Sequence, residues 1–205
     1  HRKLSDSLED MVERRVAFLT DYQDASYAGR YKALVERVRA VEAQRTPGRD
    51  QLSRAVARYL FKLMSYKDEY EVARLYTDGR FLDQVKSQFE GDYKLKFHLA
   101  PPATAQVDPV TGHLKKQEFG PAMMLGFRLL AKMKGLRGTR WDIFARNPER
   151  QMERRLISDY VAVVEELLSG LSPANHGLAV EIASVPEETA DFTFKLAAIA
   201  MTIGM

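Results

Sequence analysis

The chain has 205 residues, of which 45% are hydrophobic and 29% charged, and its net charge at pH 7 is +3. These proportions are typical of globular proteins, and the length is enough to bury a core without covalent cross-links. The chain contains no cysteine, which excludes disulfides, cysteine nucleophiles and cysteine-ligated metal sites within it. We expect a cytoplasmic location.

The charge is unevenly distributed along the chain. Residues 115–155 contain eleven Lys and Arg against four Asp and Glu, a net charge of +7. Residues 156–205 contain one lysine against seven acidic residues, a net charge of −6. Such stretches are usually solvated or mutually compensating faces of one fold. The alternative is that the basic stretch is a surface for an anionic partner.

Three amphipathic helices are predicted in the first third of the chain, because apolar residues recur there at spacings of three and four. The stripes are Leu8, Met11, Val12, Val16 and Leu19; Tyr27, Tyr31, Leu34, Val35, Val38 and Val41; and Leu52, Val56, Tyr59, Leu60 and Leu63. Residues 45–48 break the pattern between the second and third stripes. We expect the three helices to pack as antiparallel neighbours.

Residues 66–102 form the stretch with the densest polar side chains. A helix is predicted over residues 67–78, with acidic residues at its start that oppose the helix dipole favourably. Residues four apart share a helix face, so we expect Glu71 to pair with Lys67 and Tyr70 to stack on Arg74. Capping and ion pairing therefore explain much of this polarity.

A second helix and a strand are predicted to follow this helix. Gly79 ends the first helix, and Phe81, Leu82, Val85 and Phe89 mark the second. The alternation of Tyr93, Leu95, Phe97 and Leu99 with Lys94, Lys96 and His98 predicts a half-buried strand. Because a strand needs a partner, we place one within residues 103–118, around a turn at 108–112.

The remaining elements are also helical. After Pro121 the chain is apolar on nearly all sides, which predicts a central buried helix. Its apolar residues are Met123, Met124, Leu125, Phe127, Leu129, Leu130 and Met133. Asn147-Pro148 and Ser172-Pro173 predict two further helix starts. The predicted fold class is mainly α: a single helical domain over residues 1–205, with one small β-hairpin near residues 93–118.

The sequence contains no motif that assigns an enzymatic reaction. It has no glycine-rich phosphate loop, no His-Glu-x-x-His pair and no nucleophile elbow. Its four histidines, among them His98, lie far apart in sequence and lack the spacing of a metal site. We assign no catalytic, cofactor-binding or metal-ligating residue. A small enzyme built around Glu69, Glu71 and His98 is the remaining catalytic alternative.

Charged residues in and after the polar stretch are candidates for an interface with a neighbouring domain. They are Lys67, Asp68, Glu69, Arg74, Asp78, Lys96, His98, Arg137 and Arg140. Trp141 beside Arg140 is a combination found on nucleic-acid surfaces, but aromatic residues are few in the basic stretch, so we expect no nucleic-acid partner. Residues 192–205 are too few to span a membrane, and we expect no membrane partner.

Four segments resemble the C-terminal region of the fused indolepyruvate ferredoxin oxidoreductases, a family of 2-oxoacid:ferredoxin oxidoreductases. They are RRVAFLTDYQDASYAGRYKALVERVR (14–39), KLMSYKDEYEVARLYTDGRFLDQVKSQFEGDYKLKFHLAPP (62–102), KKQEFGPAMMLGFRLLAKMKGLRGTRWDIF (115–144) and ERQMERRLISDYVAVVEELL (149–168). The resemblance covers roughly residues 7–188. Residues 190–205 depart from the family pattern and form a diverged apolar terminal segment.

The resemblance implies that this chain is a C-terminal fragment of a larger multidomain enzyme. That family oxidatively decarboxylates aryl-pyruvates to acyl-coenzyme A with thiamine diphosphate and iron–sulfur clusters, and passes electrons to ferredoxin. Those cofactors belong to upstream modules, so we expect none within this chain. The implied role is a non-catalytic accessory domain that packs on the catalytic modules, and homo-oligomers are compatible with it. The alternative is a stand-alone binding module whose basic 115–155 surface takes coenzyme A or nucleic acid.

Overall fold

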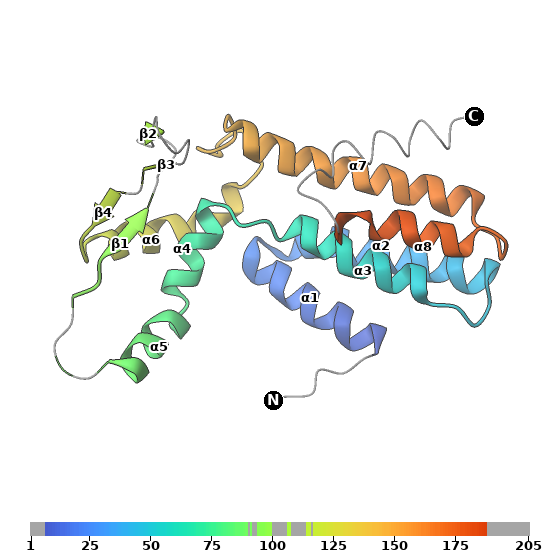
Figure 1. The fold of residues 1–205 in the computed structure, drawn as a ribbon, viewed down its shortest axis with the longest axis horizontal. Coiled ribbons are helices and arrows are strands. Elements are labelled where there is room, and N and C mark those ends of the chain that lie inside the picture. Colours follow the sequence, from blue (N-terminus) through green and yellow to red (C-terminus); the bar gives the residue numbers. More distant parts are fainter. Residues whose placement is uncertain are drawn as a thin grey trace. The chain divides into compact units, whose positions relative to one another are not determined.

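The computed structural model of the protein is mainly helical, with short antiparallel strand pairs (Figure 1). It describes residues 7–89, 91, 94–99, 106–107, 114–115 and 117–187, so the terminal segment predicted over 190–205 lies outside the described residues. Described residues up to Tyr66 and from Pro148 onward form a compact unit 1, and those from Lys67 to Asn147 form unit 2. The mainly helical class is confirmed, and the single domain stays a prediction.

Unit 1 is a group of helices drawn from both ends of the chain. It comprises α1 (Leu8–Tyr22), α2 (Ala25–Arg45), α3 (Gln51–Met64), α7 (Pro148–Gly170), α8 (His176–Ser184) and the short η2 (Val185–Glu187). Every residue of the three predicted apolar stripes lies in the core of this unit or packs against it, which confirms the first three helices. The helix α3 packs against α1, α2, α7 and α8, so it is the central helix of unit 1.

The helix α8 begins later than predicted. The Asn175 side chain accepts a hydrogen bond from the Ser172 N–H (2.8 Å) and donates one to the Gly170 carbonyl (2.8 Å). These bonds hold residues 170–175 in a turn, so α8 starts at His176 rather than directly after Pro173.

Buried tyrosines anchor the core of unit 1 to main-chain carbonyls. Their hydroxyls donate from Tyr22 to Tyr66 (2.8 Å), Tyr27 to Met64 (2.9 Å), Tyr31 to Ala57 (3.0 Å) and Tyr160 to Ala183 (2.8 Å). Several of these carbonyls lie at helix ends, where no intrahelical N–H is available to them. Burial raises the pKa of Tyr31 and of Tyr160, so both hydroxyls remain neutral donors.

One buried carboxylate joins three helices of unit 1. Glu42 of α2, 1% exposed, accepts hydrogen bonds from the N–H groups of Leu52 (2.8 Å) and Ser53 (2.9 Å) in the first turn of α3. It also accepts the Ser53 hydroxyl (2.5 Å) and contacts His176 Nε2 of α8 (2.7 Å). Asp50 makes no side-chain capping bond, so Glu42 caps α3 in its place.

Unit 2 combines short helices with short strands. It comprises α4 (Glu69–Thr77), α5 (Arg80–Gln88), β1 (Phe97–Leu99), β2 (Gln106–Val107), β3 (Leu114–Lys115), β4 (Gln117–Phe119), α6 (Met123–Lys132) and η1 (Lys134–Leu136). The strand β1 pairs antiparallel with β4, and β2 pairs antiparallel with β3. The strand predicted over 93–99 is therefore shorter, and its partner β4 begins within the expected 103–118 range and ends one residue beyond it. The turn predicted at 108–112 lies outside the described residues.

The helix α6 is not buried, so the prediction of a central helix after Pro121 is wrong. Phe127 is its only buried residue, and it packs on Tyr76 (ring centroids 4.9 Å apart) and Phe97 (5.3 Å). Leu125 and Leu129 are 67% and 64% exposed. The small core of unit 2 covers one face of α6. The other face of this helix carries apolar side chains in contact with solvent.

Candidate docking site

The site is built on the N-terminal end of α4, where Asp68 forms a buried ion pair. Its carboxylate caps the helix by accepting the Glu71 N–H (2.8 Å). It also accepts two hydrogen bonds from Arg137, at 2.5 Å from Nε and 2.8 Å from Nη2, and the two side chains are 3% and 2% exposed. A two-point guanidinium–carboxylate pair fixes geometry as well as charge. It therefore holds the residues after η1 against the start of α4.

A second buried carboxylate, that of Asp142, holds the backbone of the 137–144 loop in place. Asp142 accepts hydrogen bonds from the N–H groups of Gly138 (2.8 Å) and Phe144 (3.0 Å), and from the Tyr70 hydroxyl of α4 (3.1 Å). Burial, and then the nearby Asp142 carboxylate, raises the pKa of Tyr70, which keeps its hydroxyl a neutral donor. Gly138 has a φ of +72°, a left-handed conformation that favours glycine. We call Asp68, Tyr70, Arg137 and Asp142 the polar network.

The 137–144 loop presents large apolar side chains to solvent. Trp141 is 65% exposed and Ile143 is 63% exposed, although Asp142 between them is buried. The Arg140 guanidinium carbon lies 4.9 Å from the centroid of the Trp141 ring, within cation–π range. Tryptophan and arginine carry a large share of the binding energy at protein interfaces. The loop thus combines typical interface anchors with a backbone that buried hydrogen bonds hold in place.

Two of the predicted interface residues are not on the surface. Asp68 and Arg137 lie in the polar network and bind each other, so they are unavailable to a partner. Arg74 donates two hydrogen bonds of 2.8 Å to the buried Glu71, where we expected Lys67 to pair with this carboxylate. Lys67 is exposed. The expected neighbour of Arg74, Tyr70, instead has the Arg137 guanidinium 5.5 Å from its ring centroid and Phe144 packed edge-on at 5.2 Å.

The other predicted interface residues lie in two further places. Asp78 ends α4 and is 4.0 Å from Arg74, on the helix that Glu69 begins. Lys96 and His98 are exposed near β1, where Lys96 binds Glu118 of β4 (2.8 Å) and His98 is opposite Glu118 in the strand pair. The Lys96 side chain lowers the pKa of Glu118. Glu71 is bound by Arg74, which argues against the catalytic alternative built on Glu69, Glu71 and His98.

Sequence reasoning missed Asp142, Trp141 and Ile143 as a group. The signal in the sequence was weak. Asp142 lies between two large apolar residues, and an aspartate side chain can accept a hydrogen bond from the backbone N–H two residues later. Which of these side chains turns inward depends on Tyr70, about seventy residues earlier. Among the described residues, no three or more His, Asp or Glu side chains are grouped to hold a metal ion. No described helix is long and apolar enough to cross a membrane.

The profile of a protein family of unknown function, DUF6537, matches residues 8–192. The chain belongs to the DUF6537 family. The DUF6537 match includes the whole polar network and the 137–144 loop, together with all the described helices. No curated protein and no solved structure matches the chain.

Proposed function

We propose that this chain is a non-catalytic accessory domain that docks on the catalytic modules of a larger enzyme through its 137–144 loop. The observation that supports this most directly is the exposure of Trp141 and Ile143 on a loop held by the polar network. A loop already fixed in one conformation loses little entropy on binding, so its anchors contribute more of their burial to affinity.

The parent enzyme that we propose is an indolepyruvate ferredoxin oxidoreductase, with thiamine diphosphate and iron–sulfur clusters on modules outside this chain. The resemblance of four long segments supports this assignment. The non-catalytic role is supported by the buried carboxylates of the site, because Asp68 and Glu71 are each occupied by an arginine. A general acid or base needs access to the proton that it transfers.

Binding of the isolated chain to catalytic modules that lack this region tests the docking role. We expect Trp141→Ala with Ile143→Ser to weaken binding at least tenfold in calorimetric titrations. Phe89→Ala is the matched control, because Phe89 is 58% exposed elsewhere in unit 2. Unchanged affinity of the double variant contradicts the role of the loop. Thiamine diphosphate binding or aryl-pyruvate turnover by the isolated chain contradicts the non-catalytic role.

The rival function is a binding module for an anionic partner. Arg128, Lys132 and Arg140 are exposed and favour it, whereas Arg137 and Arg150 of the same basic stretch are buried and bound by carboxylates. Titration with coenzyme A and with a single-stranded oligonucleotide over a salt series separates the two functions. Steeply salt-dependent oligonucleotide binding supports the rival, because phosphate contacts release counterions.

A further inference from the structure

The outward side of α6 combines exposed leucines with exposed cations. Leu125 (67% exposed) and Leu129 (64%) are four residues apart and so share one face of the helix. Arg128 and Lys132 are exposed at matching spacings. The opposite side of α6 packs into the aromatic cluster around Phe127, so the exposed leucines and cations face away from the core of unit 2. We call Leu125, Arg128, Leu129 and Lys132 the α6 face.

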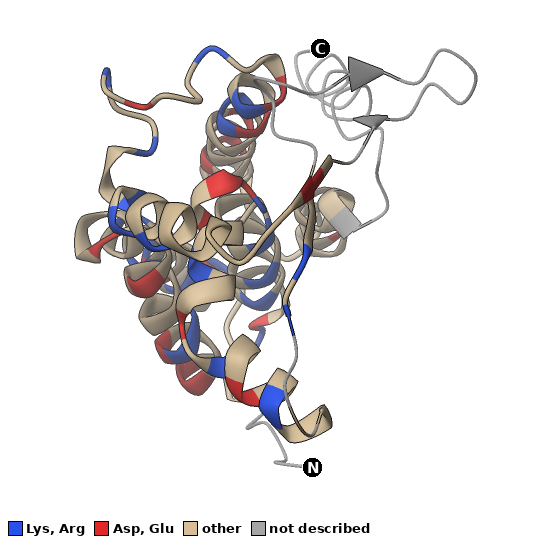
Figure 2. Cartoon of the chain, turned by 90° about the vertical axis from the view of Figure 1, so that its left-hand side faces the viewer, with Lys and Arg blue, Asp and Glu red and all other residues tan. Residues whose placement is uncertain are grey.

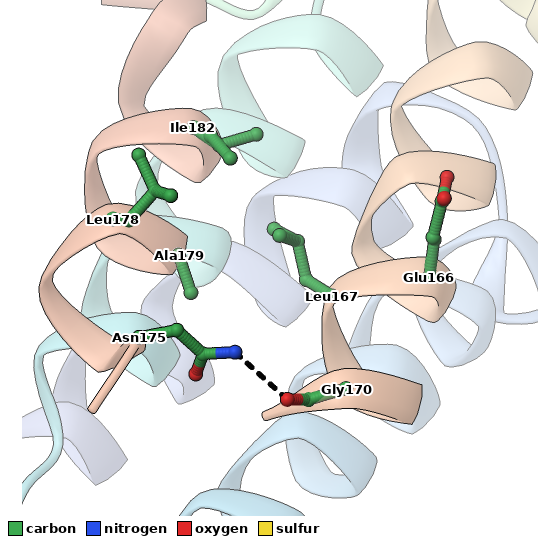
Figure 3. Close-up of a pocket in the computed structure, with 7 residues that line it drawn as sticks. All are labelled: Glu166, Leu167, Gly170, Asn175, Leu178, Ala179 and Ile182. Atoms are coloured by element: carbon green, nitrogen blue, oxygen red, sulfur yellow. Dashed lines mark hydrogen bonds between the residues drawn. The ribbon is translucent and has the colours of Figure 1, made fainter. Parts of the chain in front are cut away.

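Unit 1 contains an apolar groove between α7 and α8 (Figure 3). Its volume is about 160 Å³, and Leu167, Leu178, Ala179 and Ile182 line it. A cavity of about 150 Å³ admits a benzene ring, so this groove can receive a leucine side chain. The Asn175 amide closes one end with its hydrogen bond to Gly170. Leu178 is 58% exposed, so the groove has an apolar lip in contact with solvent.

Two exposed acids lie on the helices that form the α7–α8 groove. Glu166 lines the groove on α7, and Glu181 is exposed on α8, three residues after the lining residue Leu178. Charged residues of both signs lie along the helices (Figure 2). Within the part of the chain that the structure describes, neither these two acids nor Arg128 and Lys132 have an ion-pair partner. The α6 face and the groove are therefore complementary in both hydrophobicity and charge.

We propose that the α6 face of one copy docks into the α7–α8 groove of a second copy, independently of the function proposed above. The two surfaces come from the sequence stretches of opposite net charge, +7 over 115–155 and −6 over 156–205. Each copy carries both surfaces, and the pair that we propose is the two-fold one, in which each copy gives its α6 face and receives that of the other. Two contacts in one such pair reinforce each other.

Sedimentation velocity of the 205-residue chain from about 5 to 200 μM gives the first test. The mass is expected to rise with concentration toward twice that of the single chain. Leu125→Ser with Leu129→Ser is expected to leave a monomer over the whole range. Both leucines are exposed, so the fold should persist, and far-UV circular dichroism checks this. A monomeric unmodified chain at every concentration overturns the proposal.

Charge reversal tests the pairing of the two surfaces. Arg128→Glu with Lys132→Glu puts like charges together, and so does Glu166→Lys with Glu181→Lys, so each variant alone should be monomeric. An equimolar mixture should dimerise, because the acidic face of one variant meets the basic groove of the other while the second contact stays native. The matched control, Arg80→Glu with Lys86→Glu on α5, should dimerise like the unmodified chain. A mixture that stays monomeric, or a control that does not dimerise, overturns the pairing.

Discussion

The ion pair of Asp68 and Arg137 combines near-complete burial with a two-point contact. Both side chains are almost fully buried, and removing two charges from water costs several kcal/mol for each ion. Their mutual attraction offsets this cost only when the remaining hydrogen-bonding positions are filled. Asp68 meets this condition with two bonds from Arg137 and one from the Glu71 N–H. The pair therefore serves to specify the position of the 137–144 loop more than to add stability.

Removing one partner of this pair should be strongly destabilising. Arg137→Met leaves the Asp68 carboxylate buried without a counter-charge, and we expect unit 2 to lose about 3–5 kcal/mol of unfolding free energy. Urea unfolding followed by the fluorescence of Trp141, the only tryptophan, measures this loss. Arg140→Met at an exposed position should change stability by less than about 0.5 kcal/mol.

The matching double variant separates charge from shape. Asp68→Asn with Arg137→Met removes both charges, and Asn retains the capping oxygen for α4. It should regain most of the lost stability. A double variant as unstable as Arg137→Met contradicts the role that we assign to the uncompensated charge.

Tyr160 should make stability fall in alkaline solution. Its pKa in the folded protein is raised by burial, whereas an unfolded tyrosine ionises near pH 10. Above about pH 10 the unfolded state therefore binds fewer protons than the folded state, and stability declines by up to about 1.4 kcal/mol per pH unit for this residue. Below that pH the contribution is fully present.

Tyr160→Phe measures this contribution. The slope of unfolding free energy against pH between about 10 and 11.5 should become shallower by up to about 1.4 kcal/mol per pH unit. The variant also loses the bond to the Ala183 carbonyl, which should cost about 1 kcal/mol at pH 7, where no tyrosine ionises. An unchanged alkaline slope contradicts the assignment.

Helices were predictable to the extent that their apolar residues occupy one face. The stripes of α1, α2 and α3 each indicate one buried side, and the structure has them there. In α6 the apolar residues surround the helix, so periodicity does not say which side the small core of unit 2 will cover. Polar partners far apart in the sequence were not predictable. Arg137 lies 69 residues from Asp68, and His176 lies 134 from Glu42, with many equivalent charges between them.

Glu42 connects the start of α3 to α2 and α8, so its loss should destabilise the first turn of α3. Glu42→Ala leaves the N–H groups of Leu52 and Ser53 without their acceptor, at a cost of about 1–3 kcal/mol for each buried group. Hydrogen exchange should accelerate in the first turn of α3. Glu36→Ala, at an exposed position of the same helix, is the control and should leave this exchange unchanged.

At the scale of the whole molecule, the described residues form two hydrophobic cores that share no residue. One is formed by residues of unit 1 alone and the other by residues of unit 2 alone. Unit 2 is thus an insertion between α3 and α7, and none of its described side chains belongs to the core of unit 1. Because the two cores are separate, the single domain that we predicted from the sequence can be tested by removing one of them.

Replacing the insertion tests whether unit 1 is self-sufficient. We expect a chain in which about 20 Gly and Ser residues, spanning about 25 Å on average, replace residues 67–147 to remain helical and to melt cooperatively. Circular dichroism at 222 nm follows both properties. Loss of helicity or of the cooperative transition means that unit 1 needs unit 2, and supports one domain.

The same insertion imposes a delay during synthesis. The helices α1, α2 and α3 leave the ribosome before α7 and α8, but α3 packs against these two helices, which follow an insertion of 81 residues. At about 5–20 residues per second, translation of the insertion alone takes about 4–16 s, and α3 waits at least that long for these partners. Throughout that interval the nascent chain displays the side of α3 that they will cover, while Glu42 lacks His176. The newborn protein therefore exposes apolar side chains of α3 until α7 and α8 have been translated, and it is more prone to aggregation in that interval.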